Sequence, residues 1–85
     1  MFFVYFIQSL KNKKVYVGKT SKEPSERLRD HNRSSNKFTR SNKPFKLIYY
    51  ETYICEECAR MRENFYKKGF GKEIKKLIVE SLRRD

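Results

Sequence analysis

The chain has 85 residues, with 21 Lys or Arg against 10 Asp or Glu, giving a net charge of +11 at neutral pH. This length excludes a large multidomain enzyme, and we expect a single domain over residues 1–85 with one modest core. The 7 Phe and 6 Tyr residues can supply that core, which argues against disorder despite the mean hydropathy of -0.91. No run approaches the roughly 18 apolar residues of a membrane span, and a signal peptide is not evident. We therefore expect a cytoplasmic protein that does not bind membranes.

Positive charge is concentrated in two stretches that contain no acid. Residues 1–22 and residues 33–46 each carry five basic side chains. A field of one sign attracts polyanions, and nucleic acid is the commonest of these partners. Two other interpretations stay open, namely a solubilising lysine surface and an adaptor for an acidic protein partner. An anionic membrane is disfavoured, because the basic stretches do not lie on a strongly amphipathic helix.

The first elements in chain order form a predicted hairpin. Residues 2–9 are rich in Phe, Val, Tyr and Ile, which predicts a strand buried on both faces. A polar break at 11–13 precedes a second strand over 14–18. We expect Tyr5 to lie opposite Tyr16, so that both hydroxyl groups project from one face. The other face then carries Val4, Phe6, Val15 and Val17.

The remaining elements alternate helix, strand and two helices. Pro24, with acidic residues on either side, predicts a helix over 24–33, and the polar residues 34–44 predict a loop. The pattern then predicts a strand over 45–53, a helix over 55–68 ended by Gly69 and Gly71, and a last helix over 73–84. The expected fold class is α/β in the broad sense (α+β). A small, three-stranded, mainly antiparallel sheet is flanked by helices in the order β-β-α-β-α-α.

Cys55 and Cys58 form a CxxC pair. A zinc site needs four ligands, and His31, the single histidine of the chain, is distant in sequence. We interpret the two cysteines as small residues that open a helix, in preference to a zinc or redox site.

Several short motifs, in this order along the chain, resemble the GIY-YIG nuclease domain. Val4-Tyr5 and Tyr16-Val17-Gly18 resemble the two motifs that give the family its name. Arg27 and His31, one helical turn apart, are similar to its helix-borne arginine and the tyrosine or histidine that follows. Residues 59–63 resemble the segment that carries its metal-binding glutamate, here Glu63. The resemblance extends over essentially the whole chain, including segments 39–51 and 69–73. It differs in having Phe3 where the first motif has glycine.

The resemblance implies a divalent-metal-dependent endonuclease that hydrolyses phosphodiester bonds. Its catalytic residues would be Tyr5, Tyr16, Arg27, His31 and Glu63. Glu63 would be the ligand of Mg²⁺ (or Mn²⁺), for which one carboxylate suffices when water and substrate oxygens complete the shell.

Tyr5 is the candidate general base. A phenol of pKa about 10 is a poor base unless His31 takes its proton, or unless positive charge from Lys19, Arg27 and the metal lowers its pKa. Tyr16 would orient the water or the phosphate, and which tyrosine is the base stays open.

Arg27 would clamp the phosphate through its planar guanidinium. The stretch before it is one residue longer than usual in the family, so Arg29, which points to another side of the helix, remains an alternative.

Each of these side chains also has an ordinary interpretation when the family is set aside. Glu63 is spaced to pair with Lys67 one turn later, and Arg27 could pair with Glu23 or Asp30 at the surface. The tyrosines could simply pack a hairpin, and His31 could be a surface or half-buried histidine.

Substrate contacts are expected beyond the catalytic centre. Lys19 would touch the same phosphate, while the loop would place Lys37, Arg40 and Lys43 on the backbone and stack Phe38 on a base. DNA is favoured over RNA, and another protein could supply specificity. The alternative function is a catalytically weak nucleic-acid-binding module of the same fold.

Overall fold

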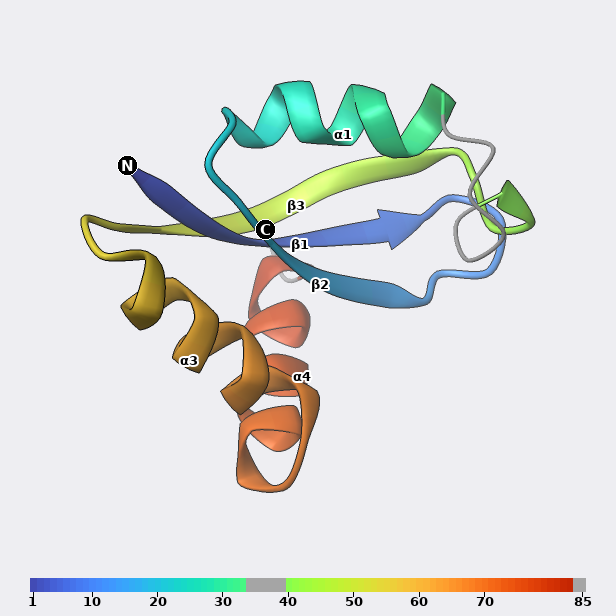
Figure 1. Cartoon of the computed structure of the whole chain (residues 1–85). Helices are drawn as coiled ribbons and strands as arrows, with labels where there is room; N and C mark the ends of the chain where they lie inside the picture. The colour runs from blue at the N-terminus through green and yellow to red at the C-terminus, as the bar shows by residue number, and fades with distance from the viewer. Residues whose placement is uncertain (34–39, 84–85) are drawn as a thin grey trace.

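The computed structural model describes residues 1–33 and 40–83. Its elements, in chain order, are β1 (Phe2–Ser9), β2 (Val15–Thr20), α1 (Pro24–Arg33), β3 (Phe45–Tyr53), α3 (Glu56–Lys67) and α4 (Phe70–Arg83). Within these residues the strands form one antiparallel sheet of order β2-β1-β3, so that β1 is the central strand (Figure 1). The predicted α+β class and the element order are confirmed.

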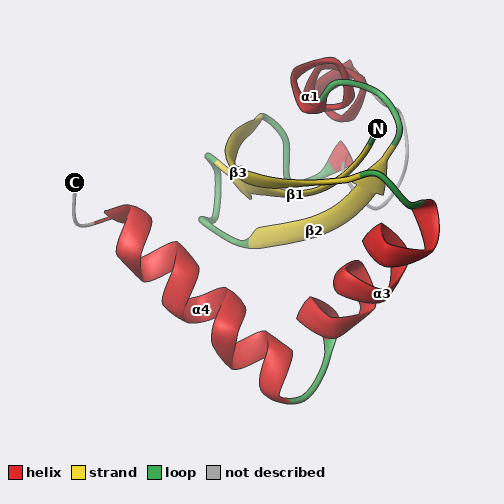
Figure 2. Cartoon of the chain, turned by 90° about the vertical axis from the view of Figure 1, so that its left-hand side faces the viewer, coloured by secondary structure: helices red, strands yellow, loops and turns green. Residues whose placement is uncertain are grey.

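Helices cover both faces of this sheet. Figure 1 shows α1 above the strands and the other two helices below, and Figure 2 shows α3 and α4 diverging beneath the sheet. Because side chains alternate along β1, they contribute to two apolar clusters, one on each face of the sheet. The lower cluster joins the sheet to α3 and α4 and centres on Val4, Phe6, Ala59, Tyr66 and Val79. The upper cluster lies under Leu28 of α1 and contains Tyr5, Ile7 and Phe45.

The hairpin register differs from the prediction. Tyr5 lies opposite Gly18, and Tyr16 lies opposite Ile7, so the expected pairing of the two tyrosines is wrong. The displacement is two residues, which is the period of a strand, and both phenols therefore stay on the upper face. The four valine and phenylalanine residues expected on the other face do lie in or against the lower cluster.

A wider turn causes this displacement. The backbone of Ser9 pairs with Lys14 (N to O, 2.9 Å), leaving four residues in the turn, and Lys13 adopts a left-handed conformation with φ 67°. The Ser9 hydroxyl oxygen accepts hydrogen bonds from the backbone N–H groups of Lys11 and Asn12, at 3.1 and 3.2 Å. These bonds satisfy donors that would otherwise be unpaired in the turn.

The helix ends near the predicted positions, with one exception. Cys55 is the N-cap of α3, and its Sγ accepts a hydrogen bond from the N–H of Cys58 at 3.4 Å, in agreement with the helix-opening interpretation. Gly69, with φ 59°, separates the last two helices. Gly71 was expected to break a helix, but it lies inside α4. A Cβ at Gly71 would be 1.7 Å from the carbonyl oxygen of Phe65, so glycine permits the close approach of the two helices.

A half-buried carboxylate fixes α3 to the sheet. Glu51 of β3 accepts hydrogen bonds from the hydroxyl groups of Tyr53 (2.6 Å), Tyr49 (2.7 Å) and Tyr66, and from Nε of Arg62 (3.3 Å). Burial raises the pKa of this carboxyl, but the three phenols and the arginine outweigh burial and hold the pKa of Glu51 below its usual value. Two of these partners belong to α3, so the cluster sets the position of the helix turn between them.

Candidate active site

A phenol and a glycine are in close contact on the upper face of the hairpin. The side chain of Tyr5 extends from the central strand over Gly18 of the edge strand and is only 3% exposed. A Cβ at Gly18 would lie 2.2 Å from Tyr5 Oη and 2.4 Å from Cζ. Only glycine leaves room for the phenol here, and its absence of a side chain lets the Tyr5 hydroxyl reach the edge of the sheet.

His31 of α1 contacts the same hydroxyl. Tyr5 Oη lies 2.8 Å from His31 Nε2. Burial, and then the positive charge of Arg27, lower the pKa of His31 below its usual value, so the imidazole is neutral at neutral pH. With the ring proton on Nδ1, Nε2 accepts and the phenol donates, which gives the Tyr5 proton a defined acceptor.

The pKa of Tyr5 is set by opposing effects. Burial raises it, the charge and hydrogen bonding of Arg27 lower it, and the carboxylates of Glu63 and Asp30 raise it further. The net result is that the pKa of Tyr5 is raised. From the sequence, nearby positive charge was considered as a cause that could lower it. Burial is the reason, because it disfavours the phenolate more than one guanidinium favours it.

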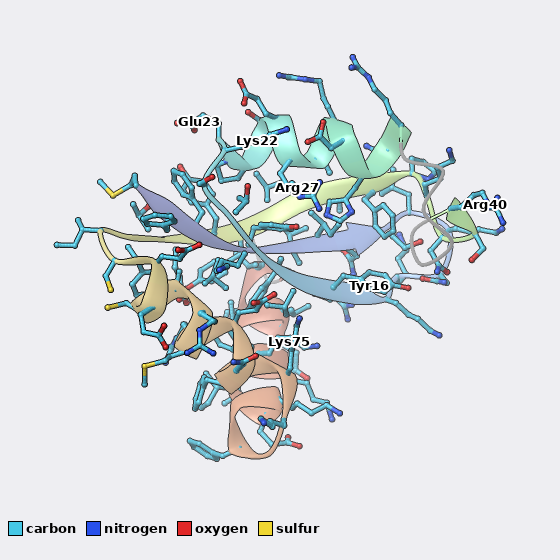
Figure 3. All side chains as sticks on the ribbon, in the orientation of Figure 1. Tyr16, Lys22, Glu23, Arg27, Arg40 and Lys75 are labelled. Carbon is cyan, nitrogen blue, oxygen red and sulfur yellow. The ribbon has the colours of Figure 1, made fainter. Side chains whose placement is uncertain are left out.

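Arg27, rather than Arg29, lies at this centre. It projects from the side of α1 that faces the sheet (Figure 3), half-buried, and its Nη1 lies 3.6 Å from Asp30 Oδ2. The charge and hydrogen bonding of Arg27 lower the pKa of Tyr5. Arg29 is exposed on another side of the helix, as the 3.6-residue period requires.

Glu63 approaches from α3, below the edge strand. It lies four residues after Ala59 and three before Tyr66, both buried, so it shares the helix face that packs on the sheet. Its side chain is 18% exposed, and Oε2 is 3.0 Å from Nζ of Lys67. The ordinary ion pair at i+4 is therefore present. The charge of the same carboxylate also contributes to the raised pKa of Tyr5.

Tyr16 lies farther along β2. It is two residues before Gly18, about 7 Å along the strand, and on the same face. Its ring packs edge-on against Phe45, with centroids 5.4 Å apart. It therefore stands beside the centre formed by Tyr5, Arg27 and His31.

The expected substrate contacts are more scattered. Lys19 lies opposite Val4, on the lower face, and its Nζ is 3.3 Å from Glu56 Oε2, so it points away from the Tyr5 face. Arg40 is exposed beyond the C-terminal end of β1 (Figure 3), and Lys43 is half-buried just before β3. Lys37 and Phe38 lie outside the described residues.

The donor set at this centre is small. Within residues 1–33 and 40–83, no three His, Cys, Asp or Glu side chains cluster as a metal site would require. What Glu63 offers is a single, mostly buried carboxylate. That donor suits a hard cation that keeps most of its own water, and it does not suit a cation that needs a full set of protein ligands.

Comparison with known proteins identifies one family. The model of the GIY-YIG catalytic domain matches residues 1–77. No significant match was found among curated proteins or among solved structures. Across the described part of the chain, each helix is too short or too polar to span a bilayer.

Proposed function

The chain belongs to the GIY-YIG family, and on that premise we propose that it is a divalent-metal-dependent endonuclease that hydrolyses phosphodiester bonds in DNA. The observation that supports this most strongly is the convergence at one sheet edge. Tyr5 Oη lies 2.8 Å from His31 Nε2 there, and the charges of Arg27 and Glu63 both act on the pKa of the phenol.

Tyr5 acts as the general base in this proposal. Its hydroxyl proton passes to Nε2 of His31, 2.8 Å away, and the phenolate oxygen then takes a proton from the attacking water. Burial opposes the phenolate, and the guanidinium of Arg27 favours it. Tyr16, on the same face, would orient the water or the phosphate.

Arg27 binds the scissile phosphate. Its guanidinium presents parallel N–H donors that match two non-bridging phosphate oxygens, and its charge is fixed at all relevant pH values. The edge of β2 leaves it accessible, because its side chain is 39% exposed beside the buried Tyr5.

Glu63 would hold the cation, Mg²⁺ or Mn²⁺, by exchanging its ion pair with Lys67 for a bond to the metal. When bound, such an ion stabilises negative charge on the phosphate and on the departing oxygen.

A second candidate function is a weakly catalytic nucleic-acid-binding module of the same fold. Two observations favour it, namely the ion pair that already neutralises Glu63 and the raised pKa of Tyr5. Both would slow the reaction without weakening electrostatic binding.

The test compares cleavage of branched, nicked and single-stranded DNA and a matched RNA, with Mg²⁺, with Mn²⁺ and with EDTA. Glu63→Gln should lower metal-dependent cleavage about a hundredfold or more, the scale for loss of one charge-stabilising group, while affinity in EDTA persists. Glu73→Gln is the matched control, because Glu73 is an exposed helix glutamate that pairs with a lysine on its own helix. Equal cleavage by Glu63→Gln and the control would reject the metal site. Binding without cleavage by the unmodified chain would favour the second function.

A further inference from the structure

A group of lysines on α4 lies outside the centre described above. Lys72, Lys75 and Lys76 are spaced three and four residues apart, which places them on one side of the helix, where like charges repel. Lys76 is balanced by Glu73 at 3.7 Å. Lys75 has no carboxylate partner among the described residues, although it is only half exposed. This arrangement favours binding of an anion from outside the chain.

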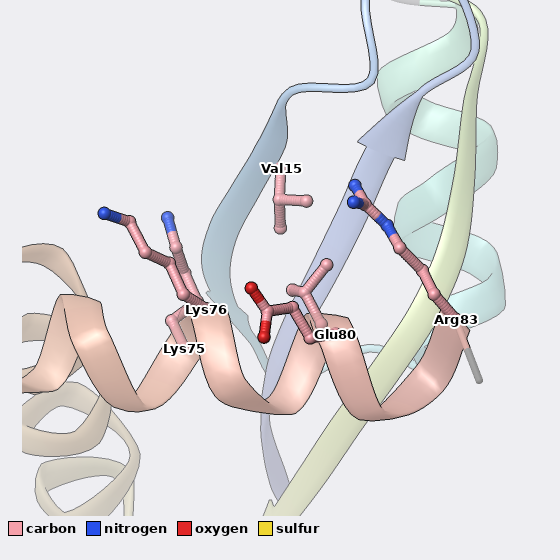
Figure 4. Close-up of a pocket in the computed structure, with 6 residues that line it drawn as sticks. Val15, Lys75, Lys76, Glu80 and Arg83 are labelled. Atoms are coloured by element: carbon pink, nitrogen blue, oxygen red, sulfur yellow. The ribbon is translucent and has the colours of Figure 1, made fainter.

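Lys75 also lines a small cavity. The cavity has a volume of about 260 Å³ and lies between the start of β2 and α4. Figure 4 shows Lys75 and Lys76 on one side of Val15, Arg83 on the other, and Glu80 between them. Val15 and Val79 provide its apolar walls, and the cations exceed the one carboxylate. Burial, and then the charges of Lys72 and Lys76, lower the pKa of Lys75.

The position of the cavity relates it to the proposed reaction centre. Val15 and Gly18 belong to the same edge strand, three residues apart, so their backbones are about 10 Å apart and their outward directions lie on opposite faces of the sheet. A strand lying along the edge of β2 would therefore meet both sites.

We propose that Lys75, Lys76 and Arg83 bind the phosphate backbone of the nucleic acid, beside the phosphate held at Tyr5 and Arg27. The inference rests on the proposed function, because it takes that centre as its reference. It assigns the lower side of the sheet edge to substrate binding. The contacts position the strand and do not read its sequence, since they reach only phosphate oxygens.

The test measures binding of a fluorescent 16-base-pair DNA duplex in EDTA, by anisotropy, from 50 to 200 mM salt. Each of the variants Lys75→Ala and Arg83→Ala should reduce the slope of log K against log salt by about 0.9. If variant and unmodified chain bind equally at 1 M salt, the variant then binds roughly eightfold more weakly at 0.1 M salt. Lys46→Ala is the matched control. It removes one exposed lysine from β3, the opposite edge of the sheet, and should change the slope little.

The outcomes separate the inference from the function on which it rests. The inference would be overturned if Lys75→Ala and Arg83→Ala had the same slopes and affinities as Lys46→Ala. It would also be overturned if the unmodified chain did not bind the duplex. Binding with the expected slopes but no cleavage would support the inference and reject the reaction alone. Inorganic phosphate provides a further arm. If it shifts the amide signals of Val15 and Val79 as fully as the duplex does, the cavity is a free-anion site and the backbone assignment fails.

Discussion

Replacing Gly18 with alanine should disable the centre through a steric effect on Tyr5. The new Cβ would lie 2.2 Å from Tyr5 Oη, whereas ordinary contact begins at 3.4 Å, so the hydroxyl must move by about 1.2 Å (3.4 minus 2.2). Helix α1 covers this face and Tyr5 is 3% exposed, so little space is available for the ring. The 2.8 Å hydrogen bond to His31 should break. A displacement of about 1 Å in a reacting group can cost roughly a hundredfold in rate, and overpacking should cost about 1–3 kcal/mol of stability.

The assay combines the single-turnover cleavage rate with thermal unfolding. Gly69→Ala is the control, because a Cβ there meets nothing within 4 Å, while its φ of +59° still imposes backbone strain. The control should lose stability and keep the cleavage rate. Gly18→Ala should lose both. If Gly18→Ala cleaved at the unmodified rate and unfolded at the same temperature, the contact between Tyr5 and the edge strand would be wrong.

The remaining predictions concern two titratable groups. His31 is the single histidine of the chain, so its NMR signal is isolated, and its pKa should lie below 6.5. In Arg27→Gln the pKa of His31 should rise, because one positive charge is removed. A pKa of His31 at or above 6.5 in the unmodified chain would contradict its role as the proton acceptor. Because the folded pKa is lowered, cleavage and stability should be maintained above pH 6.5 and fall as pH drops through the lowered value. Glu51→Gln, assayed by urea unfolding, should lose about 2 to 3 kcal/mol, because an amide cannot accept from all four donors; equal stability to the exposed Glu57→Gln would refute the anchoring role. The pKa of Glu51 is lowered, so its contribution should be present above the ordinary carboxyl pKa and lost as pH falls through the lowered value.

The element order and the division of each strand into two faces could be predicted from the sequence. Alternation in β1 places Val4 and Phe6 on one face and Tyr5 on the other, whatever the register. The register itself could not be obtained, because it depends on hydrogen bonds of the Ser9 side chain inside the turn. Gly71 shows the same limit, since its role is a contact with Phe65 on another helix.

The candidate site was predictable where spacing alone decides position. Arg27 and His31, four residues apart, had to share a side of α1. The alternation of side chains along β2 also predicts that Lys19 faces away from Tyr5, because Lys19 follows Gly18 directly. The Glu51 cluster was missed, since tyrosines from two elements converge on it only after folding.

The most direct measurement of the central claim is the single-turnover cleavage rate of Tyr5→Phe, with DNA affinity measured in parallel. The phenyl ring fills the same space and only the hydroxyl that contacts His31 is removed. Loss of a general base predicts a fall of about a hundred- to ten-thousandfold in rate with unchanged affinity, while Tyr50→Phe, at a 51% exposed tyrosine, should cleave normally. A Tyr5→Phe rate equal to that of the unmodified chain would contradict the account and assign the base to Tyr16 or to solvent.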